Sequence, residues 1–427
     1  MLDINLIRNN PELVKKSLAK KMYEVSFDDF LAVDKQYREI NLLNDELRAK
    51  RNKVSDGIAA LKKSGQNVQP IYEEMKAIGQ KIAENDVIIK ELFDKNQAFL
   101  SGLPNMPDDD LLTGGKESNA VVFEYGEKPQ FDFTPKNHVE LCELNGIIDY
   151  KRGVKLAGSG YWIYSDVGAR LEWAILNFFV SEHLKDKYKF MLVPHMLNYS
   201  CGYGAGQFPK FSEEVYWLKE EEGEAPKFLL PTAETALVNL HSGEILSEDE
   251  LPKKYFGYTP CYRKEAGSYR TEERGMIRGH QFNKIEMIQY TTPENSAEAF
   301  KELVGKAESL VRQLGLCFRT SKLGAADCSA SMARTYDIEV WIPSMGIFKE
   351  VSSVSNAKDY QARRSNTRYR NSKTDKTEFV HILNGSGLAT SRIIPALVEQ
   401  HQQKDGSIVL PDAIAAFYGE KVIRPIK

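Results

Sequence analysis

The sequence predicts an α+β protein in which a long antiparallel pair of helices precedes a larger domain built on an antiparallel sheet. Residues from about 30 to 100 carry apolar side chains at alternating steps of three and four, which is the spacing of packed helices. Farther along, strand-like segments follow one another in neighbouring pairs, which favours an antiparallel sheet with flanking helices. The 427 residues are too many for one ordinary domain.

The first region is predicted to form a coiled-coil arm. Two heptad series are separated by a glycine-containing break at 62–70, as expected for a helical hairpin. A dimerisation coiled coil would show the same pattern. Polar residues that interrupt the seam are expected to fix its register: Asn44, Arg51, Asn85 and Asn96. Basic residues in the first helix and near the tip fit phosphate binding and a solvated face equally well: Lys50, Arg51, Lys53, Lys62 and Lys63.

A linker rich in proline and aspartate follows at 101–110, and we place the domain boundary between residues 105 and 106. The domains are therefore 1–105, with its arm, and 106–427. The elements predicted in the second domain are a helix at 171–184, a short buried strand at 189–193, strands at 256–263 and 284–290, a helix at 298–314, and a hairpin of strands at 336–342 and 347–351.

Bulk composition excludes several classes of protein. A net charge of −3 gives no global electrostatic argument for binding nucleic acid, so any such contact must be local. The five cysteines have no paired spacing, which argues against a disulfide framework or a zinc site and fits a reducing cytoplasm. No apolar run approaches about 18 residues, and the start has no signal-peptide pattern, so we expect no membrane association.

Two distant stretches, 263–286 and 383–392, supply most of the residues that indicate chemistry. The glycine-rich phosphate motifs GxxxxGK[ST] and GxGxxG are absent, so phosphate binding must come from side chains. Arginine suits this task because its planar fork binds phosphate oxygens in pairs and keeps its charge. The two stretches supply three candidate arginines, an aromatic ring and several carboxylates. These residue types are suited to a site that binds a nucleoside triphosphate beside a small zwitterion.

These stretches, together with the opening residues 1–11, Thr-Ala-Glu at 232–234 and Glu-Val-Ser-Ser at 350–353, resemble the bacterial seryl-tRNA synthetases. This resemblance runs from the first residue to the C-terminal tail, and it implies a class II synthetase catalytic domain. It implies activation of L-serine by ATP with Mg²⁺, and transfer of serine to tRNA-Ser. Family members commonly also charge tRNA-Sec. The helix and strand that end at Pro194 resemble the motif that builds a homodimer, in which the arm would grip tRNA-Ser bound by the other subunit.

The resemblance implies an ATP site made of Arg263, Lys264, Glu265, Arg278, Phe282, Glu350, Val351, Ser352, Ser353 and Arg392. Arg263 would bind the α-phosphate and the serine carboxylate. Arg278 and Arg392 would hold the γ-phosphate of a bent ATP from opposite sides. These three arginines are the implied catalytic residues, because neutralising the charge at phosphorus is the main task.

The remaining roles follow from the same resemblance. Glu265 would bind the adenine amino group, Phe282 would stack on the ring, and Glu350 with Ser353 would hold Mg²⁺. The implied serine site contains Thr232, Ala233, Glu234, Arg263, Glu286, Asn384 and Ser386. In it, Glu234 would pair with the ammonium group, and Glu286 with Ser386 would sense the hydroxyl. A serine carboxylate needs no general base, so we regard His280 as structural.

Taken singly, these residues have ordinary explanations, such as a loop salt bridge for Arg263 with Glu265 or a surface position for Arg392. Three other functions stay open: a duplicate seryl enzyme that resists a serine-analogue antibiotic, a related ligase that loads a carrier protein, and a non-catalytic coiled-coil scaffold. Three segments depart from the family pattern, namely 197–204, 269–272 and 326–330. Contacts to the tRNA end are expected to differ at 269–272 and 326–330.

Overall fold

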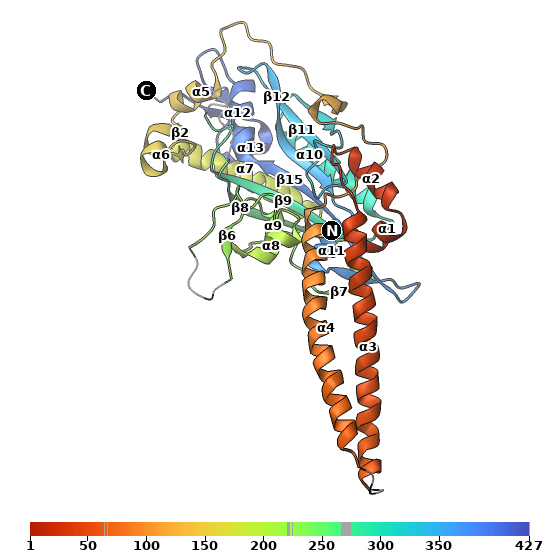
Figure 1. Cartoon of the computed structure of the whole chain (residues 1–427). Coiled ribbons are helices and arrows are strands. Elements are labelled where there is room, and N and C mark those ends of the chain that lie inside the picture. The colour runs from red at the N-terminus through yellow and green to blue at the C-terminus, as the bar shows by residue number, and fades with distance from the viewer. Residues whose placement is uncertain (64, 66, 220–222, 224, 266–274, 427) are drawn as a thin grey trace. The chain divides into compact units, whose positions relative to one another are not determined.

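The computed structural model describes residues 1–63, 65, 67–219, 223, 225–265 and 275–426. Contacts divide the chain into two compact units. One unit contains Leu2–Lys16 and Glu24–Leu103, and the other contains Met1, Ser17–Tyr23 and Pro104–Lys427. The N-terminal region begins with the short helices α1 (Ile4–Asn9) and α2 (Pro11–Ala19), and it continues into α3 (Asp28–Lys63) and α4 (Gln69–Gly102) (Figure 1).

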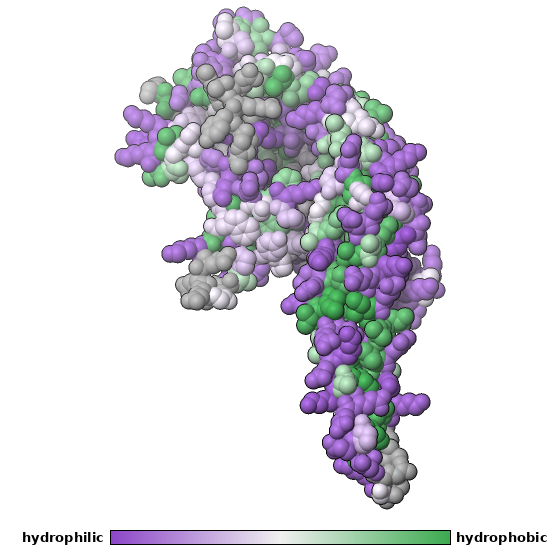
Figure 2. All heavy atoms as spheres, viewed as in Figure 1, coloured by the Kyte–Doolittle hydropathy of each residue, from purple (hydrophilic) through white to green (hydrophobic). Residues whose placement is uncertain are grey.

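Helices α3 and α4 pack side by side in opposite directions, which confirms the predicted helical hairpin. The ring of Phe30 near the start of α3 stacks on Phe99 near the end of α4, with centroids 4.9 Å apart. Farther toward the tip, Lys50 pairs with Glu74 at 2.6 Å. Figure 2 shows a largely hydrophilic arm surface with apolar side chains along part of its length.

A buried polar layer crosses the hairpin at its middle. The Nδ2 atom of Asn85 donates to Oδ1 of Asn44 over 3.2 Å, and Nδ2 of Asn44 donates to Asp86 over 2.8 Å. Shifting either helix would leave these buried amides without partners, so the layer fixes the register, as the sequence predicted. Arg51, also predicted in the seam, is exposed instead. Its long side chain can place the guanidinium in water while the stem covers the helix pair.

The second unit is built on an eight-stranded sheet, which confirms the predicted α+β class. Every neighbouring pair is antiparallel except the edge pair β4 and β8. In spatial order its strands are β1 (Ala120–Tyr125), β10 (Phe318–Lys322), β11 (Arg334–Ile342), β12 (Ile347–Asn356), β15 (His381–Ala389), β9 (Gln281–Thr291), β8 (Lys253–Tyr262) and β4 (Lys189–Met191). The predicted hairpins correspond to β8 with β9 and to β11 with β12.

Short elements surround this sheet. The helices are α5 (His138–Leu144), α6 (Tyr150–Ala157), α7 (Asp166–Lys185), α8 (Tyr199–Gly204), α9 (Glu234–Leu237), α10 (Ser296–Gln313), α11 (Tyr360–Ser365), α12 (Thr390–Gln400) and α13 (Asp412–Tyr418), with single 3-10 turns at Lys116–Ser118 and Glu248–Glu250. The smaller sheets pair β2 (Ile148–Asp149) with β3 (Ile163–Tyr164), β5 (Met196–Asn198) with β6 (Lys227–Leu229), β16 (Ile408–Val409) with β17 (Val422–Ile423), and β13 (Arg368–Arg370) with β7 (Ile245–Ser247) and β14 (Thr377–Phe379).

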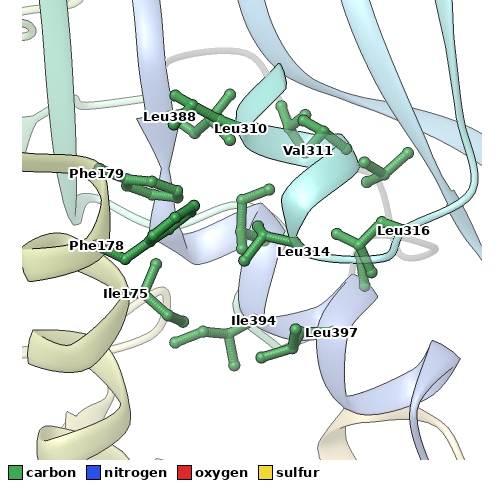
Figure 3. Close-up of a cluster of buried hydrophobic side chains, with 14 of the residues drawn as sticks. Ile175, Phe178, Phe179, Leu310, Val311, Leu314, Leu316, Leu388, Ile394 and Leu397 are labelled. Atoms are coloured by element: carbon green, nitrogen blue, oxygen red, sulfur yellow. The ribbon is translucent and has the colours of Figure 1, made fainter. Parts of the chain in front are cut away.

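Helices α7, α10 and α12 meet over one face of the sheet and form the main core with it (Figure 3). On α7 the apolar residues Leu171, Ile175 and Phe178 recur at helical spacing and point into this core. From the sheet, Ile285 and Met287 of β9 enter the same core. Because strand side chains alternate between faces, the residues between them point the other way. On the opposite face, Ile288 and Tyr290 enter a second hydrophobic cluster, and polar residues occupy the part of β9 nearer its start.

The strand at 189–193 differs from its prediction. We expected it to be buried, but in β4 the side chains of Lys189 and Phe190 are exposed. The strand lies at the edge of the sheet, where only one side is covered by a neighbour. Among the described residues no helix has the length and apolar character needed to cross a membrane.

Candidate active site

On the sheet face away from the core helices, the polar part lies on β9 and β15. Lys284 and Glu286 alternate with the core residue Ile285, so both point away from the helices. Ser386 of β15 lies directly opposite Glu286, and Asn384 lies two residues before it on the same face. The predicted serine-binding residues of these two strands are therefore neighbours.

The carboxylate of Glu286 is contacted by several of the predicted serine-binding residues. This carboxylate is 1 % exposed and lies 2.5 Å from the ammonium of Lys284. Ser386 and Thr232 donate hydroxyl hydrogen bonds to Oε2 over 3.4 and 3.3 Å. The amide of Asn384 donates to Oε1 over 3.4 Å. Residues from three distant parts of the chain thus surround one buried carboxylate, whose charge is balanced by one lysine.

A second carboxylate, that of Glu234, is half-buried and lies close enough to Glu286 for the charge of Glu286 to affect it. Glu234 begins α9, and the side-chain amide of Gln361 donates to its Oε1 over 2.9 Å. Burial raises the pKa of Glu234 to about 7, and the charge of Glu286 adds to this effect. A cation placed beside Glu234 would favour its ionised form. The position is suited to an ammonium group.

Arg263 follows β8 and lies at the end of the β8–β9 hairpin. Its backbone N–H donates to the carbonyl of His280 over 2.9 Å, and its Nε donates to the carbonyl of Pro231 over 3.2 Å. The guanidinium lies over the ring of Phe282, 5.1 Å from the ring centroid. Nδ1 of His280 lies 3.0 Å from the Arg263 carbonyl oxygen, so His280 supports the backbone here. The hairpin thus brings together Arg263 and the aromatic ring of Phe282, both of which were predicted in the ATP site.

The other two arginines each contact a carboxylate. Arg278 donates to Glu265 over 2.6 Å. Arg392, in the first turn of α12, donates to the backbone carbonyl of Glu350 over 2.8 Å and lies 3.5 Å from its carboxylate. An incoming anion can replace such partners, because a guanidinium binds phosphate oxygens in the same forked geometry as a carboxylate.

All three arginines line one cavity. Its wall is formed by Arg263, Glu265, Ile277, Arg278, Gly279, Phe282, Lys284, Glu350, Val351, Ser386, Ala389, Ser391 and Arg392. A second cavity, of about 380 Å³, contains Thr232 and Glu234 in its wall and shares Arg263 and Glu265 with the first. The two cavities therefore meet at Arg263, which fits one residue touching both a nucleotide and an amino acid.

A β-bulge brings together the two residues predicted to hold Mg²⁺. Residues three apart on a regular strand point to opposite faces. In β12, however, Val351 is an extra residue relative to β11, so Glu350 lies opposite Glu339 and Ser353 lies opposite Asp337. Glu350 and Ser353 consequently share one face.

The electrostatics of this pair fit a hard cation. Burial raises the pKa of Asp337 well above its usual range, and the charge of Glu350 contributes to the rise. The buried Oδ1 of Asp337 has no hydrogen-bond partner among the described residues. Carboxylate and hydroxyl oxygens are the protein ligands that Mg²⁺ uses together with substrate phosphates. The residues therefore fit the ion.

Some predicted residues lie beside the cavities without lining them. Ala233 is fully buried in a hydrophobic cluster, and the hydroxyl of Ser352 donates to the Ser386 backbone carbonyl over 2.7 Å. The ammonium of Lys264 lies over the ring of Tyr216. Of the unusual segments, residues 269–272 lie outside the described residues, while Ser329 lines the second cavity.

Sequence reasoning missed Lys284, Gln361 and Asp337. Lys284 could have been predicted from the sequence, because residues two apart on a strand share a face and Glu286 was already a candidate site residue. Gln361 contacts Glu234 from a helix more than a hundred residues away. Asp337 reaches the site through strand pairing. Neither has a local sequence signal.

Comparison with known proteins identifies the class first. The family model described as the tRNA synthetase class II core domain (G, H, P, S and T) matches residues 216–401, which carry almost the whole site. The fold is that of a class II aminoacyl-tRNA synthetase.

The particular family follows from the rest of the chain. The family model of the seryl-tRNA synthetase N-terminal domain matches residues 1–107. The chain is 58 % identical to serine–tRNA ligase 2 of Clostridium acetobutylicum, over 98 % of this chain and 99 % of that protein. It also resembles the crystal structure of seryl-tRNA synthetase from Pyrococcus horikoshii complexed with ATP, with a TM-score of 0.90, 33 % identity and full coverage of both chains. The chain belongs to the seryl-tRNA synthetase family.

Proposed function

We propose that this chain is a serine–tRNA ligase that activates L-serine with ATP and transfers the serine to the 3′ end of tRNA-Ser. The observation that carries the proposal is the meeting of two cavities at Arg263. One cavity is lined by three arginines and an aromatic ring, and the other is lined by Thr232 and the half-buried carboxylate of Glu234. Full-length similarity to serine–tRNA ligases supports the same activity.

In the first step, the serine carboxylate attacks the α-phosphorus and pyrophosphate leaves. The attacking group is already an anion at neutral pH, so no general base is required. Arg263 would neutralise charge at the α-phosphate, while Arg278 and Arg392 would hold the γ-phosphate of a bent ATP. Positioning and charge neutralisation then provide the rate enhancement. In the second step, the ribose hydroxyl of the terminal tRNA adenosine attacks the carbonyl carbon of the seryl adenylate, the bond from that carbon to the phosphate oxygen breaks, and AMP leaves.

The remaining predicted residues of the ATP site would bind the adenine and the ion. Phe282 would stack on adenine, and Glu265 would accept a hydrogen bond from its amino group. Glu350 and Ser353 would hold Mg²⁺, which when bound neutralises phosphate charge. Val351 lines the cavity of the three arginines, and the backbones of Lys264 and Ser352 would bind ATP at its margin.

The side chain of the substrate serine would bind among the buried residues that contact Glu286. Ser386, Asn384 and Thr232 all contact this carboxylate, so a hydroxyl placed among them finds both donors and acceptors. Alanine would occupy the same space but leave these buried polar groups unpaired. Glu234 would bind the serine ammonium, with Thr232 and Ala233 shaping the adjoining backbone.

The protonation state of Glu234 predicts how serine binding depends on pH. Because the pKa of Glu234 is about 7 in the free protein, the carboxylate loses its charge as the pH falls through this value. We expect kcat/KM for serine to fall on the acid side of about pH 7, approaching tenfold per pH unit. Serine-dependent ATP–pyrophosphate exchange measured between pH 5.5 and 8 would check this.

The matched control is Glu234→Gln, which keeps the shape and cannot titrate. Its kcat/KM for serine should be about 10²-fold lower at neutral pH, because a charge-assisted hydrogen bond is lost. Its acid limb should be absent. An acid limb that is unchanged in this variant would assign the titration to another group.

Substrate comparison tests the function itself. Serine should support ATP–pyrophosphate exchange, while alanine should be rejected by about 10⁴-fold and threonine by about 10²-fold or more. Charging of tRNA-Ser should follow. Exchange without charging would instead favour a ligase that loads a carrier protein, and no exchange with any amino acid would favour a scaffold. The match of residues 1–107 to a seryl-tRNA synthetase N-terminal domain disfavours the carrier ligases, since they lack the arm.

We also propose the partners that the resemblance implies. Residues 1–105 would bind tRNA-Ser, and tRNA-Sec as well, while residues 106–427 would perform catalysis.

A homodimer is supported by exposed apolar side chains on α7 and around the edge strand β4, namely Trp173, Leu184, Phe190 and Leu192. A cytoplasmic location is supported by the five cysteines, all of which are free thiols.

A further inference from the structure

Glu172 is a buried carboxylate on the core-facing side of α7. The helix otherwise turns apolar residues such as Leu171 and Ile175 toward the sheet. Glu172 is 3 % exposed, and no lysine, arginine or histidine of the described residues forms an ion pair with it. Burial raises its pKa to about 7. An apolar residue would be the less costly choice for packing at this position.

Two hydrogen-bond partners of Glu172 lie on elements that carry the ATP site, and Tyr164 of β3 is a third neighbour. The Oε1 atom of Glu172 accepts a hydrogen bond from Nδ2 of Asn283 over 2.7 Å and another from the hydroxyl of Thr390 over 2.6 Å. Asn283 directly follows Phe282 on β9. Thr390 is the first residue of α12, two positions before Arg392. The same Thr390 hydroxyl lies 3.2 Å from the Asn283 carbonyl oxygen.

Backbone pairing is irregular where these contacts occur. Ser386 pairs with Glu286 and Ala389 pairs with Lys284, so β15 has one residue more than β9 in this interval. The ladder between the two strands ends at the second pair. Phe282 lies two residues and Arg392 three residues beyond the last pair, so no backbone hydrogen bond between β9 and β15 holds either of them directly. The side-chain bridge through Glu172 spans this gap.

We propose that Glu172 is a positioning residue for ATP, which holds the start of β9 and the start of α12 at the spacing that lets Phe282 bind adenine while Arg392 binds the γ-phosphate. This inference rests on the proposed function, since it uses the roles given there to Phe282 and Arg392. Glu172 lines neither of the two cavities, so it acts only through its neighbours. The positioning role requires an oxygen that accepts the hydrogen bonds from Asn283 and Thr390. Oε1 can accept both of these bonds whether or not Oε2 carries a proton.

The test compares Glu172→Gln, which keeps an acceptor oxygen, with Glu172→Met, which removes it at similar volume. Titration calorimetry would measure ATP and serine binding separately. We expect Glu172→Met to weaken ATP binding about tenfold, because a small misplacement of a binding group has an effect of this size. Serine affinity should change by less than about twofold, and Glu172→Gln should restore ATP binding to within about twofold of the unsubstituted protein.

A buried glutamate at the other end of α12 provides the matched control. Glu399 is fully buried and accepts hydrogen bonds from His138 and Ser344, away from the cavities. Glu399→Met should lower stability without changing ATP affinity. If it weakens ATP binding as much as Glu172→Met does, general loosening explains the effect and the proposal is overturned.

Other results would also overturn the proposed role of Glu172. Unchanged ATP binding in Glu172→Met, equal losses for ATP and serine, or a Glu172→Gln variant as weak as Glu172→Met would each overturn the proposal. If Glu172→Met does not fold, Thr390→Val removes the donor from α12 at the same volume and should weaken ATP binding selectively. Absence of ATP binding by the unsubstituted protein would instead reject the proposed function itself, so the two failures are distinguishable.

Discussion

Replacing Arg263 with alanine is expected to reduce serine-dependent ATP–pyrophosphate exchange by about 10³-fold or more. Arg263 is the residue at which the two cavities meet, so its loss removes charge neutralisation at the α-phosphate and a contact to the serine carboxylate together. Arg263→Lys should recover only part of the activity, because an ammonium is a point charge and cannot bind two oxygens with the same planar fork. Steady-state exchange with both substrates varied would measure these effects.

Arg312 offers a matched control for this substitution. Its guanidinium also lies over an aromatic ring, 4.9 Å from the centroid of Tyr125, on a helix outside the site. Arg312→Ala therefore removes a similar ring contact and a similar charge, and exchange should change by less than about twofold. Thermal unfolding of both variants would show whether they are folded. An Arg263→Ala protein that is folded and within about tenfold of full activity would rule out the proposed role of Arg263 at phosphorus.

The sequence predicted most of the elements that carry the site because their signals are local. Alternation of side chains identified the strands around Glu286 and the hairpin that contains Glu350. Arg263 and Phe282 were placed at one end of a hairpin, and β8 pairs with β9 in that way. Asn44 and Asn85 were recognised in the helical seam from heptad spacing alone.

What could not be predicted depends on contacts between distant parts of the chain. The bulge at Val351, which brings Glu350 and Ser353 to one face, is set by the pairing of β12 with β11. The bridge from Glu172 to Thr390 joins residues separated by 218 positions. β4 was wrongly expected to be buried because its composition is apolar, whereas exposure depends on its edge position.

Shortening the arm should separate the two steps of the reaction. The polar layer of Asn44 and Asn85 offers a natural place for the cut, because these residues face each other across the hairpin. Deleting residues 45–84 and joining the helices by a glycine-containing turn removes every basic residue near the tip. We expect exchange to stay within about twofold, since the cavities lie wholly in the other compact unit. Charging of tRNA-Ser should lose about 10²- to 10³-fold in kcat/KM, through lost phosphate contacts.

A second variant distinguishes charge from shape as the basis of this loss. Arg51 and Lys53 have exposed side chains, and Lys62 is exposed at the tip. Changing these three to glutamate keeps the helices and reverses the local charge. If the arm binds the RNA backbone, this full-length variant should also charge poorly, and the slope of log KM against log salt concentration should fall by about one per lost phosphate contact. Normal charging by both variants would contradict tRNA binding by the arm, because a helical hairpin that recognises RNA without base readout has only its shape and its cations to use.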